Sequence, residues 1–234
     1  MYKRVLLKLS GEQLAGKFEH GIDAELGAWI ANEVRKVLEA GAQVVIMVGG
    51  GNYARGAQLA GNGIRRVTAD HIGMLATMMN ALALTDIFES QDIPTRCLSN
   101  IFAEQVAEPF VHRSANKHLS EGRVVIVAGG IGRPYLTTDT AAVSLALELD
   151  CEAVLKATKV DGVYDKDPSK FPKAHKLEHI SFSQAVSDDD IKVMDKAAMG
   201  LAMEHKLSII VFDALQTDGL LHTVSGETAG TTID

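Results

Sequence analysis

The chain has 234 residues, 47% of them hydrophobic and only 5 of them proline, so it can bury a large core. Its net charge of −7 argues against a nucleic-acid surface, and we expect no nucleic-acid partner. Its longest apolar runs, such as Val44–Val48, are too short to span a bilayer, and the first residues lack the apolar stretch of a signal peptide. We therefore expect a cytoplasmic protein with no membrane partner.

Short apolar, β-branched runs alternate with helical spacing along the chain. The first predicted strand is Val5–Leu9, and Asp23 is the predicted N-cap of a helix that reaches residue 40. The second strand is Gln43–Val48, followed by a long apolar helix over residues 68–92. Further strands are predicted at Pro94–Leu98, Val124–Val127, Glu152–Lys156 and Ser208–Phe212, with helical patterns at 112–121, 139–149 and 195–206. This alternation predicts an α/β fold with a mostly parallel sheet and helices on both faces.

Glycine-rich turns follow three of the predicted strands. They are Gly11 after the first strand, Gly49–Gly51 after the second, and Gly129–Gly132, which includes Ile131, after the strand at 124–127. A glycine at such a place lets backbone N–H groups approach an anion, because no Cβ stands in the way. The carboxyl ends of parallel strands share one sheet edge, so the three turns predict a phosphate-rich ligand there.

Two familiar glycine motifs match in part. Gly11–Phe18 has the spacing of a P-loop, but Phe18 replaces the Ser or Thr that binds magnesium, and Asp23 delays the following helix. Gly49–Ala54 fits a dinucleotide-binding motif, with Asp70 near the separation of its ribose-binding acid. That acid should end a second strand, whereas Asp70 lies in the first turn of a predicted helix. We reject the P-loop and keep a dinucleotide enzyme as the weaker alternative.

Five blocks in the sequence, taken together, are more specific than either motif. They are Lys8–Glu12, Gly49–Asn52 with Arg55–Gly56, Asp70–Thr77, Pro134–Asp139 and Leu155–Tyr164. Their order and spacing resemble those of bacterial UMP kinases, in the amino acid kinase family, over essentially the whole chain. The resemblance implies a three-layer α/β/α sandwich, reversible transfer of the ATP γ-phosphoryl group to UMP in pyrimidine nucleotide synthesis, and a homohexamer. It also implies one domain over residues 1–234, with an acceptor-binding part at roughly 1–150 and an ATP-binding part at roughly 151–234.

The resemblance assigns roles to individual residues. Catalytic roles are expected for Lys8, Arg55, Asp139 and Asp195. ATP binding is expected for Lys8, Leu9, Ser10, Gly11, Gly51, Arg55, Thr158, Tyr164 and Asp167. UMP binding is expected for Gly50, Asp70, Ile131, Gly132, Arg133, Pro134, Tyr135, Leu136, Thr137 and Thr138. Mg²⁺ is expected to accompany ATP, and no residue is expected to bind it directly.

The chemistry of phosphoryl transfer gives independent reasons to expect several of these residues at such a site. Phosphoryl transfer between two polyanions needs positive charge and N–H donors around the oxygens, which Lys8 beside Gly11 can provide. A solvated lysine at a strand end is the plainer interpretation of Lys8. Asp70 and Asp139 could act only as favourable charges at helix starts, although a carboxylate can also accept from both ribose hydroxyls. The resemblance decides for function in each case.

Two segments depart from the family pattern. UMP kinases usually have Gly-Thr-Gly where this chain has Gly130-Ile131-Gly132, so a hydroxyl near the predicted UMP site is lost while the backbone contacts remain. Residues 16–21 match only in part the stretch linked to GTP activation in some relatives. GTP as activator and UTP as inhibitor are therefore candidate effectors.

Three hypotheses from different classes follow. The first is an ATP- and magnesium-dependent UMP kinase. The second is a related kinase acting on a carboxylate or carbamate, and the third is a non-catalytic nucleotide-binding protein of the same fold. Asp70 with the run Thr137–Asp139 favours a nucleotide acceptor, and an intact Lys8 favours catalysis.

Overall fold

The computed structural model describes residues 1–54, 56–60, 63–166, 170–171, 173–188, 191, 193–227 and 230–234. Its centre is a nine-stranded sheet in the order β4-β3-β5-β2-β1-β6-β10-β11-β9. Neighbouring described strands of this sheet run parallel, apart from the antiparallel pair β10 and β11. The strands are β1 (Arg4–Leu9), β2 (Gln43–Val48), β3 (Thr95–Ser99), β4 (Glu108–Pro109), β5 (Val124–Ala128), β6 (Ala153–Thr158), β9 (His179–Ile180), β10 (Ser208–Asp213) and β11 (Gly230–Ile233).

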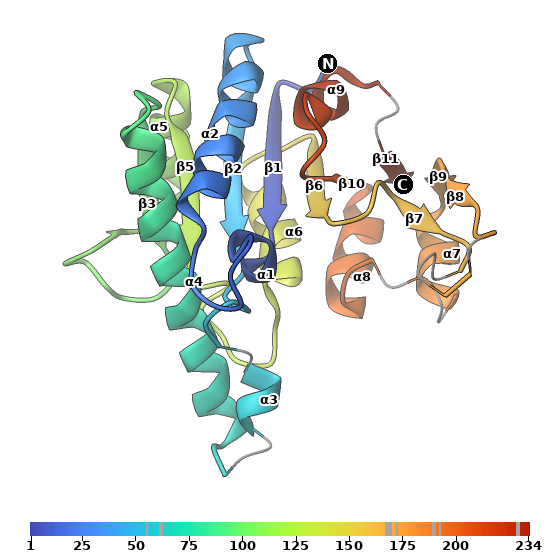
Figure 1. Cartoon of the computed structure of the whole chain (residues 1–234). Helices are drawn as coiled ribbons and strands as arrows, with labels where there is room; N and C mark the ends of the chain where they lie inside the picture. Colours follow the sequence, from blue (N-terminus) through green and yellow to red (C-terminus); the bar gives the residue numbers. More distant parts are fainter. Residues whose placement is uncertain are drawn as a thin grey trace.

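Helices cover both faces of this sheet, so the molecule has three layers (Figure 1). One face packs against α2 (Ala24–Glu39), α4 (Arg66–Glu89) and α9 (Gly219–Ser225). The other packs against α5 (His112–Ser120), α6 (Thr138–Glu148), α7 (Phe182–Ser187) and α8 (Lys196–His205). The remaining elements are α1 (Gly11–Leu14), α3 (Gly56–Ala60) and a small antiparallel sheet of β7 (Val163–Tyr164) and β8 (Lys176–Leu177). The predicted α/β/α sandwich is confirmed.

The alternation of side chains along β1 places one charged residue on a chosen face. Val5, Leu7 and Leu9 belong to the core under α2 and α4, whereas Leu6 belongs to the core under α6. Because side chains alternate across a strand, Lys8 stands on the α6 face, at the carboxyl end of β1.

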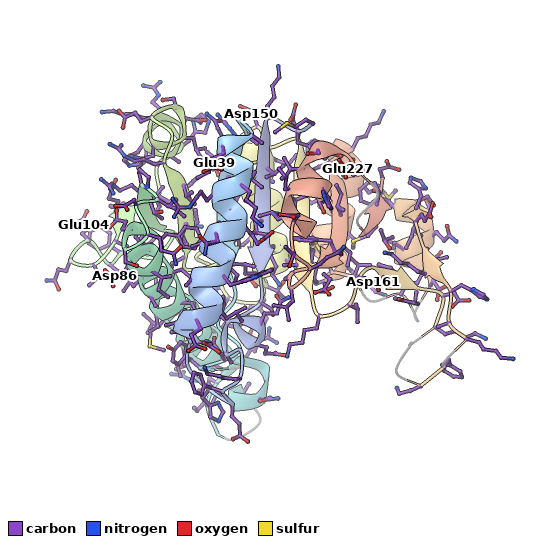
Figure 2. All side chains as sticks on the ribbon, turned by 45° about the horizontal axis from the view of Figure 1, so that its top comes forward. Glu39, Asp86, Glu104, Asp150, Asp161 and Glu227 are labelled. Atoms are coloured by element: carbon purple, nitrogen blue, oxygen red, sulfur yellow. The ribbon has the colours of Figure 1, made fainter. Side chains whose placement is uncertain are left out.

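Acidic side chains on the surface are spread around the molecule (Figure 2). Exposed examples are Glu39, Asp86, Glu104, Asp150 and Glu227.

The predicted helices and strands agree with the structure to within two or three residues, with one instructive shift. Asp23 caps α2 as expected, because its carboxylate accepts from the N–H groups of Glu25 and Leu26. The long helix, however, begins at Arg66 and not at Thr68. Residue 70 therefore lies in the second turn of α4, so the prediction of a first-turn or capping role for it is wrong.

Among the described residues, α4 is the one helix long and apolar enough to cross a membrane by length and composition. Its apolar character has a clear use in this fold. Met78, Ala81, Leu84 and Phe88 are buried in the core that α4 shares with α2 and the sheet. The helix is therefore part of the layer that covers one face of the sheet (Figure 1).

A buried pair of amides ties α4 to the glycine turn after β2. Asn52 Nδ2 donates to Asn80 Oδ1 at 2.9 Å, and Asn80 Nδ2 donates to Asn52 Oδ1 at 2.7 Å. Asn80 Nδ2 also donates to the carbonyl of Gly49 at 2.7 Å, and Asn52 Nδ2 to that of Gly21 at 2.5 Å. Neither asparagine is more than 2% exposed. Buried amides satisfied in this way fix the position of the turn.

We expect Asn80→Leu to lower the free energy of unfolding by about 2 to 3 kcal/mol, because it leaves buried acceptors on Asn52 and Gly49 without a donor. Urea denaturation followed by circular dichroism measures the change. Asp86→Leu, a polar-to-leucine change at an exposed position of the same helix, is the control and should stay within about 0.5 kcal/mol of the parent. Equal stability of the two variants would contradict the structural role of the amide pair.

Candidate active site

A buried cluster of three charges lies at the carboxyl ends of β1 and β6. Lys8 and Lys156 are register partners on these neighbouring parallel strands and share one face of the sheet. Asp139, in the first turn of α6, reaches both: its Oδ1 lies 2.7 Å from Lys8 Nζ and its Oδ2 lies 3.0 Å from Lys156 Nζ. Each oxygen of this carboxylate thus faces one ammonium group. Lys8 and Asp139, which are both expected to be catalytic, are thus in contact.

The cluster is electrostatically coupled. Burial alone would raise the pKa of Asp139, but the two ammonium groups outweigh it and hold that pKa below its ordinary value. Burial lowers the pKa of Lys156, the nearby Lys8 cation adds to this, and Asp139 opposes both. Lys156 Nζ also donates to the carbonyl of Val193. The site therefore combines two cations with one carboxylate in a partly dry setting, where their charges act strongly on an incoming anion.

Asp195 joins the starts of two helices beside this cluster. It is the N-cap of α8, where its carboxylate accepts from the N–H of Ala198 at 2.9 Å. The hydroxyl of Thr140 donates to both of its oxygens at 2.9 Å, and the hydroxyl of Thr137, the N-cap of α6, donates to Oδ2. The amino ends of α6 and α8 therefore meet at one carboxylate. Helix amino ends carry partial positive charge, so this region of the sheet edge favours anions.

A cavity of about 220 Å³ adjoins the start of α6. Its lining residues come from the turn after β2, from α4 and from the segment between β5 and α6. They are Gly50, Ala54, Arg66, Asp70, Gly73, Met74, Thr77, Gly130, Ile131, Arg133, Leu136, Thr137 and Thr138. Seven residues predicted to bind UMP are among them. The other three, Gly132, Pro134 and Tyr135, do not line this cavity.

Asp70 projects from α4 into this cavity. Its carboxylate accepts from Arg66 Nε at 2.8 and 2.9 Å and from the backbone N–H of Tyr135 at 2.8 Å. The acid thus bridges α4 and the segment before α6, two parts of the chain 65 residues apart. Since Asp70 lies inside a helix and not at the end of a strand, the dinucleotide-binding interpretation fails.

The glycine turns pack against one another and against α4. A Cβ on Gly11 would lie 2.5 Å from the backbone nitrogen of Gly51, and one on Gly50 would lie 2.8 Å from Ala76 Cβ and from the Gly73 carbonyl oxygen. Close packing alone therefore demands glycine at positions 11 and 50, a reason that sequence analysis did not find. Gly50 also lines the cavity, so a close approach to ligand and close packing coexist there.

The predicted ATP-binding residues that the structure describes lie at the ends of β1 and β6, in the turn after β2 and in β7. Leu9 points into the core, so only its backbone faces this edge. Ser10 caps α1 and exchanges hydrogen bonds with Gln13, which occupies its hydroxyl. Thr158 ends β6, and its hydroxyl donates to the carbonyl of Val160 at 2.5 Å. The hydroxyl of Tyr164, in β7, donates to Asp161 at 2.7 Å. Their contacts with ATP remain predictions.

Two predicted site residues, Arg55 and Asp167, lie outside the described residues. The lysine of the rejected P-loop, Lys17, forms an exposed ion pair with Glu25 at 2.5 Å, so it does not belong to the cluster of Lys8, Asp139 and Lys156. The third glycine turn is held by α4, since the N–H of Gly129 donates to the hydroxyl of Thr77 at 2.7 Å.

Sequence analysis assigned no ligand-binding or catalytic role to Lys156, Thr140 and Arg66, nor to the cavity residues Ala54, Gly73, Met74 and Thr77. A lysine within an otherwise buried apolar strand was the available signal for Lys156. The spacing of four residues between Arg66 and Asp70 predicts an ion pair on a helix, but the helix had been predicted to start after residue 66. For Thr140, the sequence offers no signal that we can identify.

The site thus has lysines and helix amino ends at the carboxyl edge of a parallel α/β/α sheet, beside a cavity with a carboxylate. These features define a phosphotransferase that acts on small molecules. The model of the amino acid kinase family matches residues 3–213. The chain belongs to the amino acid kinase family and is a kinase.

Its relatives narrow the group. A curated relative from Dichelobacter nodosus, named uridylate kinase, is 45% identical over 232 residues, which are 99% of this chain and 96% of the relative. The crystal structure of UMP kinase from Bacillus anthracis superimposes with a TM-score of 0.95 at 37% identity and covers 100% of this chain and 96% of its own. The crystal structure of UMP kinase from Ureaplasma parvum superimposes with a TM-score of 0.91 at 30% identity. The match covers 100% of this chain and 99% of that one.

We expect Asp139→Asn to lower the pKa of Lys156 further, because it removes the neighbour that raises this pKa most. Burial and Lys8 then lower the pKa against the weaker opposing effect of Asp195. NMR titration of ¹³Cε-labelled lysine measures the shift, and Lys156→Arg identifies the resonance by its disappearance. A pKa that stays constant or rises in Asp139→Asn would contradict the coupling of this cluster.

Proposed function

We propose that this kinase transfers the γ-phosphoryl group of ATP to UMP, giving UDP and ADP in pyrimidine nucleotide synthesis. The observation that carries the proposal is the junction of the acceptor cavity with the Lys8–Asp139–Lys156 cluster. Thr137 and Thr138 line the cavity, and Asp139, the next residue, contacts both lysines. An acceptor in the cavity would thus present its phosphate to the cations. The relatives named uridylate kinase and UMP kinase support the same acceptor.

Positive charge would do most of the catalytic work. The transferring phosphoryl group spreads negative charge over its oxygens, so groups fixed around it stabilise the transition state more than the substrates. Lys8 and Lys156 would contact these oxygens, and Asp139 would keep the two cations in place. The N–H groups at the starts of α6 and α8 would add donors on the same side.

The acceptor would lie between α4 and the segment before α6. Asp70 would accept from the ribose hydroxyls, while Thr137, Thr138 and the backbone of residues 131–136 would surround the rest of UMP. Arg133, which lines the same cavity, would supply a further positive charge. Ile131 contributes an apolar wall and its backbone.

The donor would lie across the ends of β1 and β6. Ser10, Gly11 and Gly51 would hold the phosphates, while Thr158 and Tyr164 would contact the nucleoside part of ATP. The chain would then divide into an acceptor-binding part at roughly 1–150 and an ATP-binding part at roughly 151–234 of one domain. The predicted roles of Arg55 in phosphate binding and of Asp167 in ATP binding belong to the same proposal.

Magnesium would arrive with ATP. The described residues gather no group of three or more acidic, histidine or cysteine side chains that could cage an ion, and kinases commonly hold Mg²⁺ through substrate phosphates. The site nevertheless fits such an ion, because each oxygen of Asp139 faces one lysine and a carboxylate oxygen has a second acceptor position. Asp139 is the residue that would hold it indirectly, and the ion would neutralise charge on the phosphates.

We further propose a cytoplasmic homo-oligomer, with a hexamer as the expected size. Two apolar side chains on the outer side of α4, Leu75 and Met79, are 56% and 45% exposed and lie one helical turn apart. Such a pair on a helix that is otherwise committed to the core suits a contact between subunits. GTP and UTP remain candidate effectors of this assembly.

An acceptor panel tests the function. The protein is incubated with magnesium and ATP together with UMP, CMP, GMP, AMP, aspartate or carbamate, and ADP release is measured. We expect ADP release with UMP. Release with a carboxylate or carbamate but not with UMP would favour a related kinase with another acceptor, and no release with any acceptor would favour a non-catalytic nucleotide-binding protein.

We expect Lys8→Ala to reduce kcat by about 100-fold or more, with much less change in KM for UMP, because the ammonium acts on the transferring group and not on the bound acceptor. Steady-state kinetics with UMP varied at saturating ATP measures both constants. Parallel losses in the two would point to a binding role for Lys8. Lys17→Ala, at an exposed lysine of the rejected P-loop, is the matched control.

We expect the double change Leu75→Lys and Met79→Lys to reduce the assembled mass, because it places two cations in the proposed subunit contact. Light scattering after size-exclusion chromatography measures the mass. Met203→Lys, at a methionine of α8 that is 48% exposed, is the control and should leave the mass unchanged. An unaltered mass in the double variant would exclude this face of α4 as the contact.

A further inference from the structure

Three residues form a clamp at the acceptor cavity: Arg66, Asp70 and Tyr135. Arg66 Nε donates to both carboxylate oxygens of Asp70, and the N–H of Tyr135 donates to Oδ2. The Arg66 guanidinium also lies over the Tyr135 ring, 5.3 Å from its centroid. Arg66 therefore contacts both the acid of α4 and the segment on the other side of the cavity.

The clamp holds a backbone conformation that would not be expected without it. Tyr135 has a φ of +67°, in the left-handed region that residues other than glycine seldom adopt. Its side chain is 65% exposed, so burial of the ring does little to fix the conformation. Asp70 holds its N–H and Arg66 holds its ring. Strained backbone persists where its surroundings fix it, and here these surroundings come from α4.

The same contacts aim the Asp70 carboxylate. A carboxylate has about four acceptor positions, and only two donors face this one: the Nε–H of Arg66, shared between both oxygens, and the N–H of Tyr135. The Asp70 side chain is only 11% exposed, compared with 43% for Arg66, so the acid sits inside and the base covers it from outside. What acceptor capacity remains is available to a ligand in the cavity that Asp70 lines. Groups that fix a binding side chain reduce the entropy lost when ligand binds.

We propose that Arg66 is a positioning residue: through Asp70 and Tyr135 it holds the acceptor site in its binding geometry and sets the preference for an acceptor with a complete ribose diol. The inference rests on the proposed function, in which Asp70 receives the ribose hydroxyls. Arg66 itself needs no contact with the acceptor. Its effect should therefore appear in acceptor binding and in discrimination against deoxyribose, and hardly in turnover.

Arg66→Gln tests the proposal in the full-length protein. We expect KM for UMP to rise about tenfold, because a charge-assisted contact that orients Asp70 is lost, with kcat and KM for ATP changed less than about twofold. The ratio of kcat/KM for UMP to that for 2′-deoxy-UMP should fall about fivefold or more, because Asp70 no longer holds the diol firmly. Arg66→Lys, which restores the charge, should recover most of the loss in KM.

Arg65→Gln is the matched control. Arg65 precedes α4, is exposed, makes no side-chain capping bond to the helix and does not line the cavity. We expect its kinetic constants and Tm to equal those of the parent. The Tm of Arg66→Gln should fall by no more than a few degrees, since a half-exposed ion pair contributes little stability.

A double-mutant cycle with Asp70→Asn decides whether Arg66 acts through Asp70. We expect the double variant to bind UMP no more weakly than Asp70→Asn alone. The proposal would be overturned if the increase in KM of the double variant equalled the product of the increases in the two single variants. It would also be overturned if Arg66→Gln kept the parent's preference for ribose, or if its kcat fell by as much as its KM rose. If the parent protein fails to phosphorylate UMP at all, the proposed function fails instead, which the acceptor panel shows separately.

Discussion

The site depends on one electrostatic constraint: two lysines stand side by side on neighbouring strands, and one carboxylate lies between them. Parallel strands are about 4.8 Å apart, so Lys8 and Lys156 cannot both stay charged and buried at this edge without a counter-charge. Asp139 provides it from the first turn of α6. The position of α6 is thereby fixed, and with it the position of Thr137 and Thr138, which line the acceptor cavity. The charge pattern of the catalytic region and the shape of the binding region therefore have one cause.

The second organising element is α4, which forms hydrogen bonds to two of the three glycine turns. Asn80 holds the turn after β2 through its hydrogen bond to Gly49, and Thr77 holds the turn after β5 through Gly129. The turn after β1 is then held by packing, since Gly11 lies directly against residue 51. A helix that contacts the turns from one side leaves the opposite side of the sheet edge to the cations and to α6. The acceptor cavity lies between these two layers.

Much of this arrangement could be predicted from the sequence. Long periodic segments such as α2 and buried strands such as β2 were predicted nearly to the residue, because burial on a regular element leaves a clear period. Several short elements were missed, among them the antiparallel strand β11 and the helix α9. The strand is only 4 residues long and the helix 7, and α9 starts without a side-chain cap, so neither leaves a strong local signal.

The residues of the site likewise divide into those that the sequence predicted and those that it did not. Residues in continuous blocks, such as Thr137–Asp139, were found because the resemblance covers them. Lys156 and Arg66 owe their place to tertiary contacts, to a register between two strands in the first case and to the true start of a helix in the second. Neither contact is encoded in the spacing of one segment alone. The reason for glycine at position 50, a helix passing 2.8 Å from its missing Cβ, likewise required the folded chain.

The crowding of roles on α4 has a consequence for variation. A helix at the surface of a domain normally keeps one polar face that is free to change. On α4, Leu84 and Phe88 fill the core, Ala76 must stay small beside Gly50, and Thr77 and Asn80 hold the turns. Its first turns carry the clamp, and its outer side carries exposed leucine and methionine. Sequence drift in α4 should therefore be confined to its few exposed positions outside these contacts, such as Asp86.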